Sequence, residues 1–381
     1  MIYLDNNATT KIDPRVLECM MPFLTDQYAN AASNHQLGVA VNQHIKTARM
    51  HVADLIGASS DEIIFTSGAT EAINLALKGV AEKYQNKGKH IITVTTEHPA
   101  VLDTCKYLAT IGYEITYLPV NEDGLLDIDT LKNCIRDDTI LVSVMLVNNE
   151  TGVIQPIKQI AEIVHEKGAL FMTDATQAVG KMSIDVNELG IDLLGLSAHK
   201  FYGPKGVGAL YIRSRRPNRP RLKALIHGGG HELGMRSGTL NVPGIVGLGN
   251  AAEIAKSEMN SDSKRISDIR DYMEKQFLQL NNTLVNGNTA NRLYNVSNIC
   301  FENADADAII VGLKDIAVSN GSACSSSSIE PSHVLMAMGR TEAQAFSSLR
   351  FSFGRFNSKD EAKTVIDQVT KVVSELREIV V

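Results

Sequence analysis

The sequence predicts an α/β protein, and three of its features support this prediction. Apolar runs of strand character alternate with amphipathic helical segments over about 200 residues. The length of 381 residues allows two domains, or one large domain with an appendage. Hydrophobic residues make up 44% of the chain and charged residues 21%, as is usual for a globular protein with its own core. We therefore expect a largely parallel sheet covered by helices on both faces.

The expected strands are short apolar runs bounded by turn residues, and the expected helices carry apolar residues at helical spacing. The strands are 62–66, 90–95, 114–118, 140–146, 170–174, 193–197 and 208–212. The helices between them are 71–85, 100–111, 130–136 and 157–167. This order is typical of strand–helix–strand units.

The pattern changes after residue 249. A long polar helix or helix pair is expected at 250–280, and a closing amphipathic helix at 360–381. Short strands are expected at 295–301, 317–319 and 347–354. We therefore predict a large domain over 14–255. Residues 1–13 and 256–381 would form a smaller α+β domain, with the extended first residues packing back onto it.

Composition excludes several classes of protein. The formal net charge of −6 argues against a dedicated nucleic-acid binder. A secretory signal and a membrane span are not expected, because no suitable apolar run occurs. The five cysteines are widely spaced without a C-x-x-C pair, so a disulfide framework or thiolate zinc site is not expected. This cysteine pattern fits a protein in a reducing compartment, the cytoplasm. The basic run 213–223 is interpreted as a solvated loop, with an acidic protein or tRNA as a lesser alternative.

The candidate functional residues lie in turns that follow strands, which is where open α/β sheets bind ligands. Segment 66–71 predicts an anion site at a helix N-terminus, with Ala69 and Thr70 in its small-residue loop. The alternative is a helix start capped by Thr70 or Ser67. Walker and G-x-G-x-x-G loops are absent, which disfavours ATP and NAD(P).

Two later strand ends carry ionisable side chains. Asp174 closes a buried run and requires a partner such as a cationic heterocycle, with Gln177 nearby as an amide donor. An ordinary helix cap is the alternative. Lys200 follows the strand 193–197 and is a candidate amine nucleophile. The alternative is that Lys200, or Lys205, is a surface loop lysine.

Two further turns contribute to the same edge of the sheet. His98 is placed to stack on a flat ring or to move protons, although a lone histidine is more often structural. Asn149 is a candidate to supply another amide to the same cleft, although an ordinary Asn-rich turn is an equally natural interpretation. An anion loop, an acidic strand end and a lysine strand end occur in that order, which matches the requirements of pyridoxal phosphate.

These motifs resemble those of the class V aminotransferase superfamily and, more narrowly, of NifS/IscS-type cysteine desulfurases. The superfamily resemblance rests on segments 67–71, 96–98, 148–152, 174–177 and 197–200. The narrower one rests on 228–232, 235–239 and especially 319–325. Matching residues run from 3–10 to 350–355, essentially the whole chain.

The resemblance implies the aspartate aminotransferase-like fold (fold type I) and a pyridoxal-phosphate site. Lys200 would bind the cofactor as a Schiff base and move the substrate α-proton. Asp174 would pair with the pyridinium nitrogen, Gln177 would bind the phenolic oxygen and His98 would stack on the ring. The implied cofactor-binding set is Ala69, Thr70, His98, Asn149, Asp174, Gln177, Ser197, His199, Lys200 and, from the second subunit of a homodimer, Thr239. Asn149 and Arg350 would hold the substrate carboxylate.

Cys324 distinguishes a desulfurase from its relatives. It lies among Ser, Gly, Ala and Asn in a loop expected to be mobile (about 319–331), whereas Cys19, Cys105, Cys134 and Cys300 have apolar neighbours. The resemblance implies that the Cys324 thiolate attacks the sulfur of cofactor-bound L-cysteine, leaving alanine and a persulfide.

The persulfide sulfur would then pass to an acceptor protein for iron–sulfur assembly, tRNA thiolation or DNA phosphorothioation. No resident metal is expected, apart from transient iron–sulfur ligation by Cys324. The alternatives are another pyridoxal-phosphate enzyme, such as an aminotransferase or selenocysteine lyase, and a non-catalytic binding protein.

Overall fold

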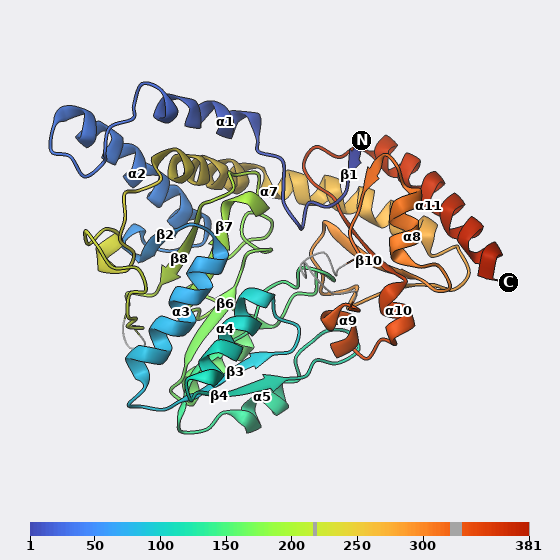
Figure 1. The fold of residues 1–381 in the computed structure, drawn as a ribbon, viewed down its shortest axis with the longest axis horizontal. Helices are drawn as coiled ribbons and strands as arrows, with labels where there is room; N and C mark the ends of the chain where they lie inside the picture. The colour runs from blue at the N-terminus through green and yellow to red at the C-terminus, as the bar shows by residue number, and fades with distance from the viewer. Residues whose placement is uncertain (216–218, 321–329, 381) are drawn as a thin grey trace.

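The computed structural model describes residues 1–215, 219–320 and 330–380. Its largest sheet has seven strands in the order β2-β8-β7-β6-β5-β3-β4 (Figure 1). The strands are β2 (Ile63–Thr66), β3 (His90–Val94), β4 (Glu114–Leu118), β5 (Thr139–Ser143), β6 (Leu170–Asp174), β7 (Leu193–Ser197) and β8 (Gly208–Ile212). Neighbours from β4 to β7 pair in parallel, whereas β8 is antiparallel to both of its neighbours. The predicted largely parallel sheet is confirmed.

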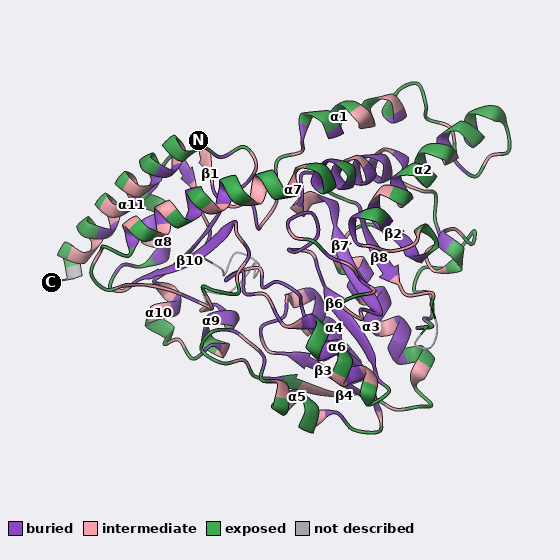
Figure 2. Cartoon of the chain, turned by 180° about the vertical axis from the view of Figure 1, so that it is seen from behind, coloured by how far each residue is buried: buried purple, intermediate pink, exposed green. Residues whose placement is uncertain are grey.

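Helices cover both faces of this sheet, so its strands are largely buried, except for the edge strand β4, while the outer helix surfaces are exposed (Figure 2). One face packs against α3 (Ala69–Tyr84) and α4 (Pro99–Thr110), and Ile91 and Met172 point to that side. The opposite face, with Ile92 and Phe171, packs against residues of the other helices. These are α1 (Pro14–Met20), α2 (Gln36–Leu55), α5 (Ile128–Cys134), α6 (Ile157–Glu166) and α7 (Val242–Phe277). Burial of both faces explains the continuous apolar runs.

A smaller α+β unit has its own core. The three-stranded antiparallel sheet β12-β10-β9 consists of β9 (Thr283–Val285), β10 (Val296–Phe301) and β12 (Ser348–Ser352). Its core contains Phe277, Phe301 and Phe351, with ring centroids 5.4 Å apart for Phe277–Phe301 and Phe277–Phe351. The helices here are α8 (Ala306–Gly312), α9 (His333–Ala337), α10 (Glu342–Phe346) and α11 (Lys359–Val380). Short 3-10 turns are η1 (Met21–Leu24), η2 (Ser60–Glu62), η3 (Ala198–Lys200) and η4 (Glu232–Gly234).

The first residues pair with strands of the smaller unit. Strand β1 (Ile2–Tyr3) pairs in parallel with β11 (Ile316–Ala317), and Asp5 forms a bridge with Ser352 of β12. The chain then crosses to the larger sheet, where the Thr10 amide donates to the His199 carbonyl at 2.9 Å. The N-terminal segment therefore connects both units at the candidate site.

Several expected boundaries are wrong. The strand expected over 140–146 ends at Ser143, and β11 ends at Ala317 instead of residue 319. The region 250–280, interpreted as a helix or helix pair, belongs to the single 36-residue helix α7, which passes from the larger to the smaller unit (Figure 1). The predicted domain boundary after residue 255 therefore falls inside a helix.

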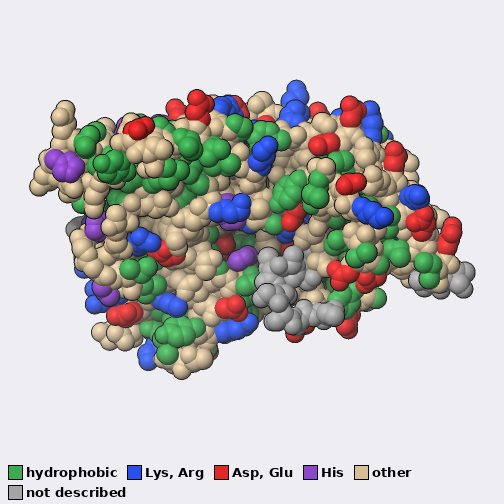
Figure 3. Space-filling model, turned by 45° about the horizontal axis from the view of Figure 1, so that its top comes forward, with side chains coloured by type: hydrophobic (Ala, Val, Ile, Leu, Met, Phe, Trp, Pro, Cys, Tyr) green, Lys and Arg blue, Asp and Glu red, His purple; other side chains and the backbone are tan. Residues whose placement is uncertain are grey.

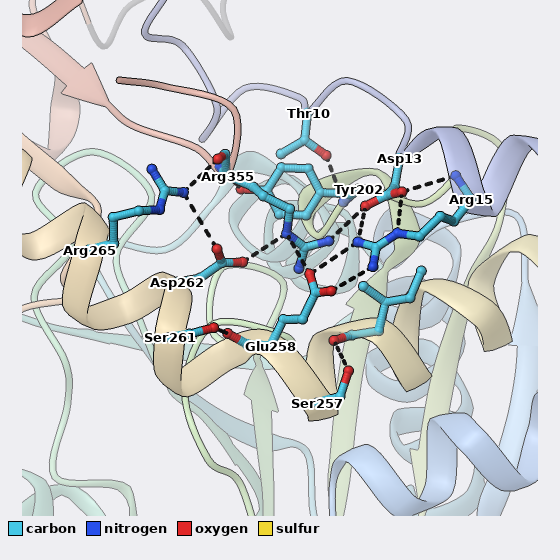
Figure 4. Close-up of polar contacts among 11 residues, drawn as sticks. Thr10, Asp13, Arg15, Tyr202, Ser257, Glu258, Ser261, Asp262, Arg265 and Arg355 are labelled. Carbon is cyan, nitrogen blue, oxygen red and sulfur yellow. Dashed lines mark hydrogen bonds and ion pairs between the residues drawn. The ribbon is translucent and has the colours of Figure 1, made fainter. Parts of the chain in front are cut away.

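A cluster of ion pairs ties α7 to the N-terminal segment and to the chain after β12 (Figure 4). The Arg355 guanidinium lies 2.9 Å from Asp13 Oδ2 and 2.8 Å from Asp262 Oδ2, and its centre is 4.5 Å from that of the Tyr202 ring. The Tyr202 hydroxyl accepts the Arg355 backbone N–H at 2.6 Å. Tyr202 follows Lys200 by two residues, so this cluster of ion pairs holds the loop that carries the candidate catalytic lysine.

No helix in the described residues combines the length and apolar character that a membrane span requires.

Candidate active site

A cavity of about 560 Å³ opens where several strands of the large sheet end. It is lined by most of the residues that the sequence singles out. These are Ala69, Thr70, His98, Asn149, Asp174, Gln177, Ser197, His199 and Lys200. Side chains that lie far apart in the sequence therefore meet in one place, at the edge where the parallel strands end.

The remaining predicted residues lie elsewhere. Arg350, on β12, is buried beside the cavity, and its guanidinium contacts the Asn149 carbonyl at 3.1 Å and Asp5 at 2.6 Å. Thr239 is exposed in the loop before α7 and does not line the cavity of its own chain. Cys324 and residues 321–329 lie outside the described residues.

The turn between β2 and α3 forms one wall of the cavity. Its helix begins after Gly68, which acts as the cap and makes no side-chain cap hydrogen bond, so the alternative of a Thr70 or Ser67 cap is wrong. The first-turn N–H groups of a 16-residue helix are thus available for an anion. The turn packs on Gly208 of β8, where a Cβ would lie 2.7 Å from the Gly68 Cα and 2.4 Å from the Leu196 carbonyl oxygen. Only glycine at 208 permits this approach.

Asp174 closes β6 and is 5% exposed. Its Oδ1 accepts the Thr176 N–H at 2.9 Å. Within residues 1–215, 219–320 and 330–380 it forms no ion pair with lysine, arginine or histidine. A buried carboxylate without a cationic partner is unfavourable, and a protonated ring nitrogen bound in the cavity would satisfy it.

His98 caps the start of α4, and its Nδ1 accepts the Ala100 N–H at 3.1 Å. Burial lowers the pKa of His98 below its ordinary value, so the ring is neutral at pH 7. With Nδ1 accepting, the proton of the neutral ring is on Nε2.

His199 also faces the cavity in its neutral form. Burial, followed by the charges of Lys200 and Lys205, lowers its pKa to about 4. Its Nδ1 lies 3.1 Å from the Thr9 hydroxyl. If that hydroxyl donates to Nδ1, Nε2 carries the proton and is a donor suited to a phosphate oxygen.

Lys200 lies in the 3-10 turn that follows β7. Its ammonium donates to two main-chain carbonyls of the N-terminal segment, those of Asn7 at 2.6 Å and Ala8 at 2.8 Å. Gln177 shares the first of these partners, because its Nε2 donates to the Asn7 carbonyl at 2.9 Å. The N-terminal segment therefore positions two of the predicted cofactor ligands.

Sequence reasoning missed several residues at this site. Asn7, Ala8 and Thr9 belong to the matching segment 3–10 but carry no predicted role, yet their main chain and side chains hold Lys200, Gln177 and His199. Glu97 is fully buried beside Asp174, where burial and then the Asp174 charge raise its pKa well above the ordinary range. The alternation of apolar and polar residues does not reveal such contacts between distant segments.

Comparison with known proteins gives the family. A model of the family described as "Aminotransferase class-V" matches residues 2–365. The chain belongs to this family. Within it, the cysteine desulfurase IscS of Histophilus somni (strain 2336) is 52% identical over 381 residues, covering 99% of this chain and 94% of that protein.

Solved structures of this family agree with the fold. One described as "NifS-like protein" has a TM-score of 0.91 at 38% identity, covering 98% of this chain and 99% of that chain. Another, described as "SspA in complex with cysteine", has a TM-score of 0.83 at 38% identity, covering 94% of this chain and 100% of that chain. The expected fold type and the resemblance to cysteine desulfurases are confirmed.

No group of three or more His, Cys, Asp or Glu side chains suited to a metal ion occurs in the described residues.

Proposed function

We propose that this protein is a cysteine desulfurase. It would convert L-cysteine to L-alanine and transfer the sulfur to Cys324 as a persulfide. The observation that carries the proposal is a cavity that gathers a helix start without a side-chain cap, a buried carboxylate and a lysine. Relatives named cysteine desulfurase at 52% identity, and a related structure described with cysteine, support the substrate.

The residues at the cavity fit pyridoxal phosphate. The N–H groups of the α3 start, with Ala69, Thr70, Ser197 and His199, would bind the phosphate. Asp174 would pair with the ring nitrogen and Gln177 would donate to the ring oxygen. When bound, the cofactor supplies an electron sink for the substrate α-carbon.

The protein side chains would then orient the substrate and move its protons. Lys200 would take the α-proton as a general base and return it to product. His98 would stack on the ring and, with its proton on Nε2, assist that transfer. Asn149 and Arg350 would hold the substrate carboxylate, with Asp5 fixing the guanidinium.

The sulfur step balances without an external oxidant. The Cys324 thiolate would attack the sulfur of L-cysteine, the carbon–sulfur bond would break, and the carbon would gain a proton to become the alanine methyl group. The enzyme would retain the sulfur as a persulfide, which a thiol acceptor removes. Iron–sulfur assembly, tRNA thiolation and DNA phosphorothioation all require such a sulfur donor.

The proposal includes a cytoplasmic homodimer in which Thr239 reaches the partner's phosphate site. Its exposed position supports this role. Apolar side chains also gather over α1 and α2 on one face (Figure 3). Leu17 of α1 and Leu37 of α2 are exposed. Mixing a Thr239→Ala subunit with a Lys200→Ala subunit tests the exchange, because a shared site predicts partial recovery of cofactor binding in the mixed dimer.

The decisive experiment is an absorbance spectrum of the purified protein before and after L-cysteine, with alanine and sulfide assayed. A visible band that responds to cysteine, together with both products, is expected. Cys324→Ala should keep the band and abolish sulfide release. Activity independent of Cys324 would identify another pyridoxal-phosphate enzyme, and absence of the band would identify a binding protein.

A further inference from the structure

Lys181 is a buried lysine beside the cavity that the proposed reaction does not use. It lies in the turn after β6 and is 4% exposed. Its Nζ donates to Gln177 Oε1 at 2.9 Å. In the described part of the chain it forms no ion pair with a carboxylate. A buried ammonium paired only with an amide oxygen is unfavourable, so its presence requires a reason.

The Gln177 amide can face only one way between its two neighbours. Lys181 Nζ donates to the amide oxygen, and it has N–H groups to donate in both its charged and its neutral form. The Asn7 carbonyl only accepts, so the amide nitrogen must face that group. Reversing the amide would set two donors against each other at one end and two acceptors at the other. The orientation is therefore fixed from both ends.

This orientation leaves one Gln177 N–H for a ligand. The amide nitrogen has two hydrogens, and the Asn7 carbonyl accepts one of them. Gln177 lines the cavity, and its second amide hydrogen has no partner among the described residues. The same Asn7 carbonyl accepts from Lys200, which links Lys181 to the candidate catalytic lysine through one amide and one carbonyl.

The charges around Lys181 are consistent with a role toward an anionic ligand. Lys200 and Arg350 face it, and its own charge acts on His199. Burial, followed by these two cations, lowers the pKa of Lys181 to about 7. Such a set of positive groups favours a ring oxygen in its deprotonated form.

We propose that Lys181 is a positioning residue: it fixes the Gln177 amide so that an N–H group faces the ring oxygen of bound pyridoxal phosphate. This inference rests on the proposed function, because it concerns the same cofactor site. In this role Lys181 contacts neither the substrate nor the cofactor.

The test uses Lys181→Met in the holoenzyme and follows the visible cofactor band as a function of pH. Both the Gln177 N–H and the nearby ammonium favour the deprotonated chromophore, so their loss should raise the midpoint of this titration. We expect about a tenfold change in proton affinity, about 1 pH unit. The exposed Lys46→Met, on α2, is the control and should leave the midpoint unchanged.

A double-mutant cycle shows whether Lys181 acts through Gln177. The midpoint shift of Lys181→Met combined with Gln177→Met should be clearly smaller than the sum of the two single shifts, because part of the Lys181 effect passes through Gln177. Additive shifts would overturn the positioning role, and so would an unmoved midpoint in folded Lys181→Met. Lys181→Leu provides the same comparison if the methionine variant does not fold.

The outcomes separate this inference from the proposed function. Absence of the band in the wild-type protein would overturn the proposed function. A wild-type protein that has the band and releases alanine and sulfide, but whose midpoint is insensitive to Lys181, would overturn only the role of Lys181. A lysine with a purely structural role would change the unfolding temperature without moving the midpoint.

Discussion

Replacing Lys181 with methionine should make the apoprotein more stable at low pH and less stable at high pH. The native pKa of Lys181, about 7, lies below the ordinary value of 10.5. Between these two values the unfolded chain binds more protons than the native protein, so stability rises with pH across this window. Below pH 7 the lysine is charged in both states, and the full cost of burying its ammonium is present.

The expected magnitude follows from the two pKa values. A fall in the pKa of Lys181 from 10.5 to about 7 corresponds to roughly 5 kcal/mol of folding free energy, at about 1.4 kcal/mol per pKa unit. Methionine removes this cost but leaves Gln177 Oε1 without its donor, which costs about 1–3 kcal/mol. The variant should therefore gain roughly 2–4 kcal/mol below pH 7 and lose about 1–3 kcal/mol above pH 10.5.

Urea unfolding of the apoprotein at pH 6, 8 and 10.5 measures this change of sign. Wild type, Lys181→Met and the exposed-lysine control Lys46→Met are compared at one protein concentration, because the stability of the proposed dimer depends on concentration. Lys46→Met should follow the wild type at every pH. Parallel pH dependences for wild type and Lys181→Met would refute the argument.

Three further changes test other parts of the structure. Asp174→Asn removes the buried carboxylate, and sulfide release should fall at least about 100-fold while the apoprotein stays folded by circular dichroism. Arg355→Met leaves Asp13 and Asp262 without this partner and should lower stability by about 3 kcal/mol; an unchanged melting temperature would contradict the role of the ion-pair cluster. Gly208→Ala introduces a Cβ 2.7 Å from the Gly68 Cα and should weaken pyridoxal-phosphate binding about tenfold, measured by titrating the apoprotein; wild-type affinity would show that the turn can shift.

The strands were the most predictable part of the fold. Four of them, β4, β6, β7 and β8, have the bounds that their apolar runs predict. The apolar run 140–146 continues for three residues beyond the end of β5 at Ser143, because those residues are also buried. The Leu146 N–H still donates to the Asp174 carbonyl at 3.0 Å. Burial and strand structure therefore coincide only in part.

Other features were less accessible from the sequence. The direction of β8 leaves no local signal, because an antiparallel strand buried on both faces has the same composition as a parallel one. Helix α2 was not predicted, although Val41, Ile45 and Val52 recur at helical spacing on its buried side. Mixed charges elsewhere on α2 obscured that pattern.

The candidate site was predictable wherever a reactive side chain follows a strand, as for Asp174 and Lys200. What the sequence did not reveal is the network behind those side chains. The Asn7 carbonyl has no sequence signature, yet it accepts hydrogen bonds from both Gln177 and Lys200. Main-chain acceptors are the same at every residue, so only the fold shows which of them are used.

The path of the N-terminal segment has a consequence for synthesis on the ribosome. The Asn7 N–H donates to the Ser352 hydroxyl, a contact that spans 345 residues. Strand β1 likewise cannot pair until β11 has been synthesised. The first residues to be translated are thus among the last to reach their native partners, and the carbonyls that hold Lys200 belong to them. We expect a nascent chain arrested before residue 348 to fold its large sheet but to bind pyridoxal phosphate poorly, so that cofactor loading follows release of the finished chain.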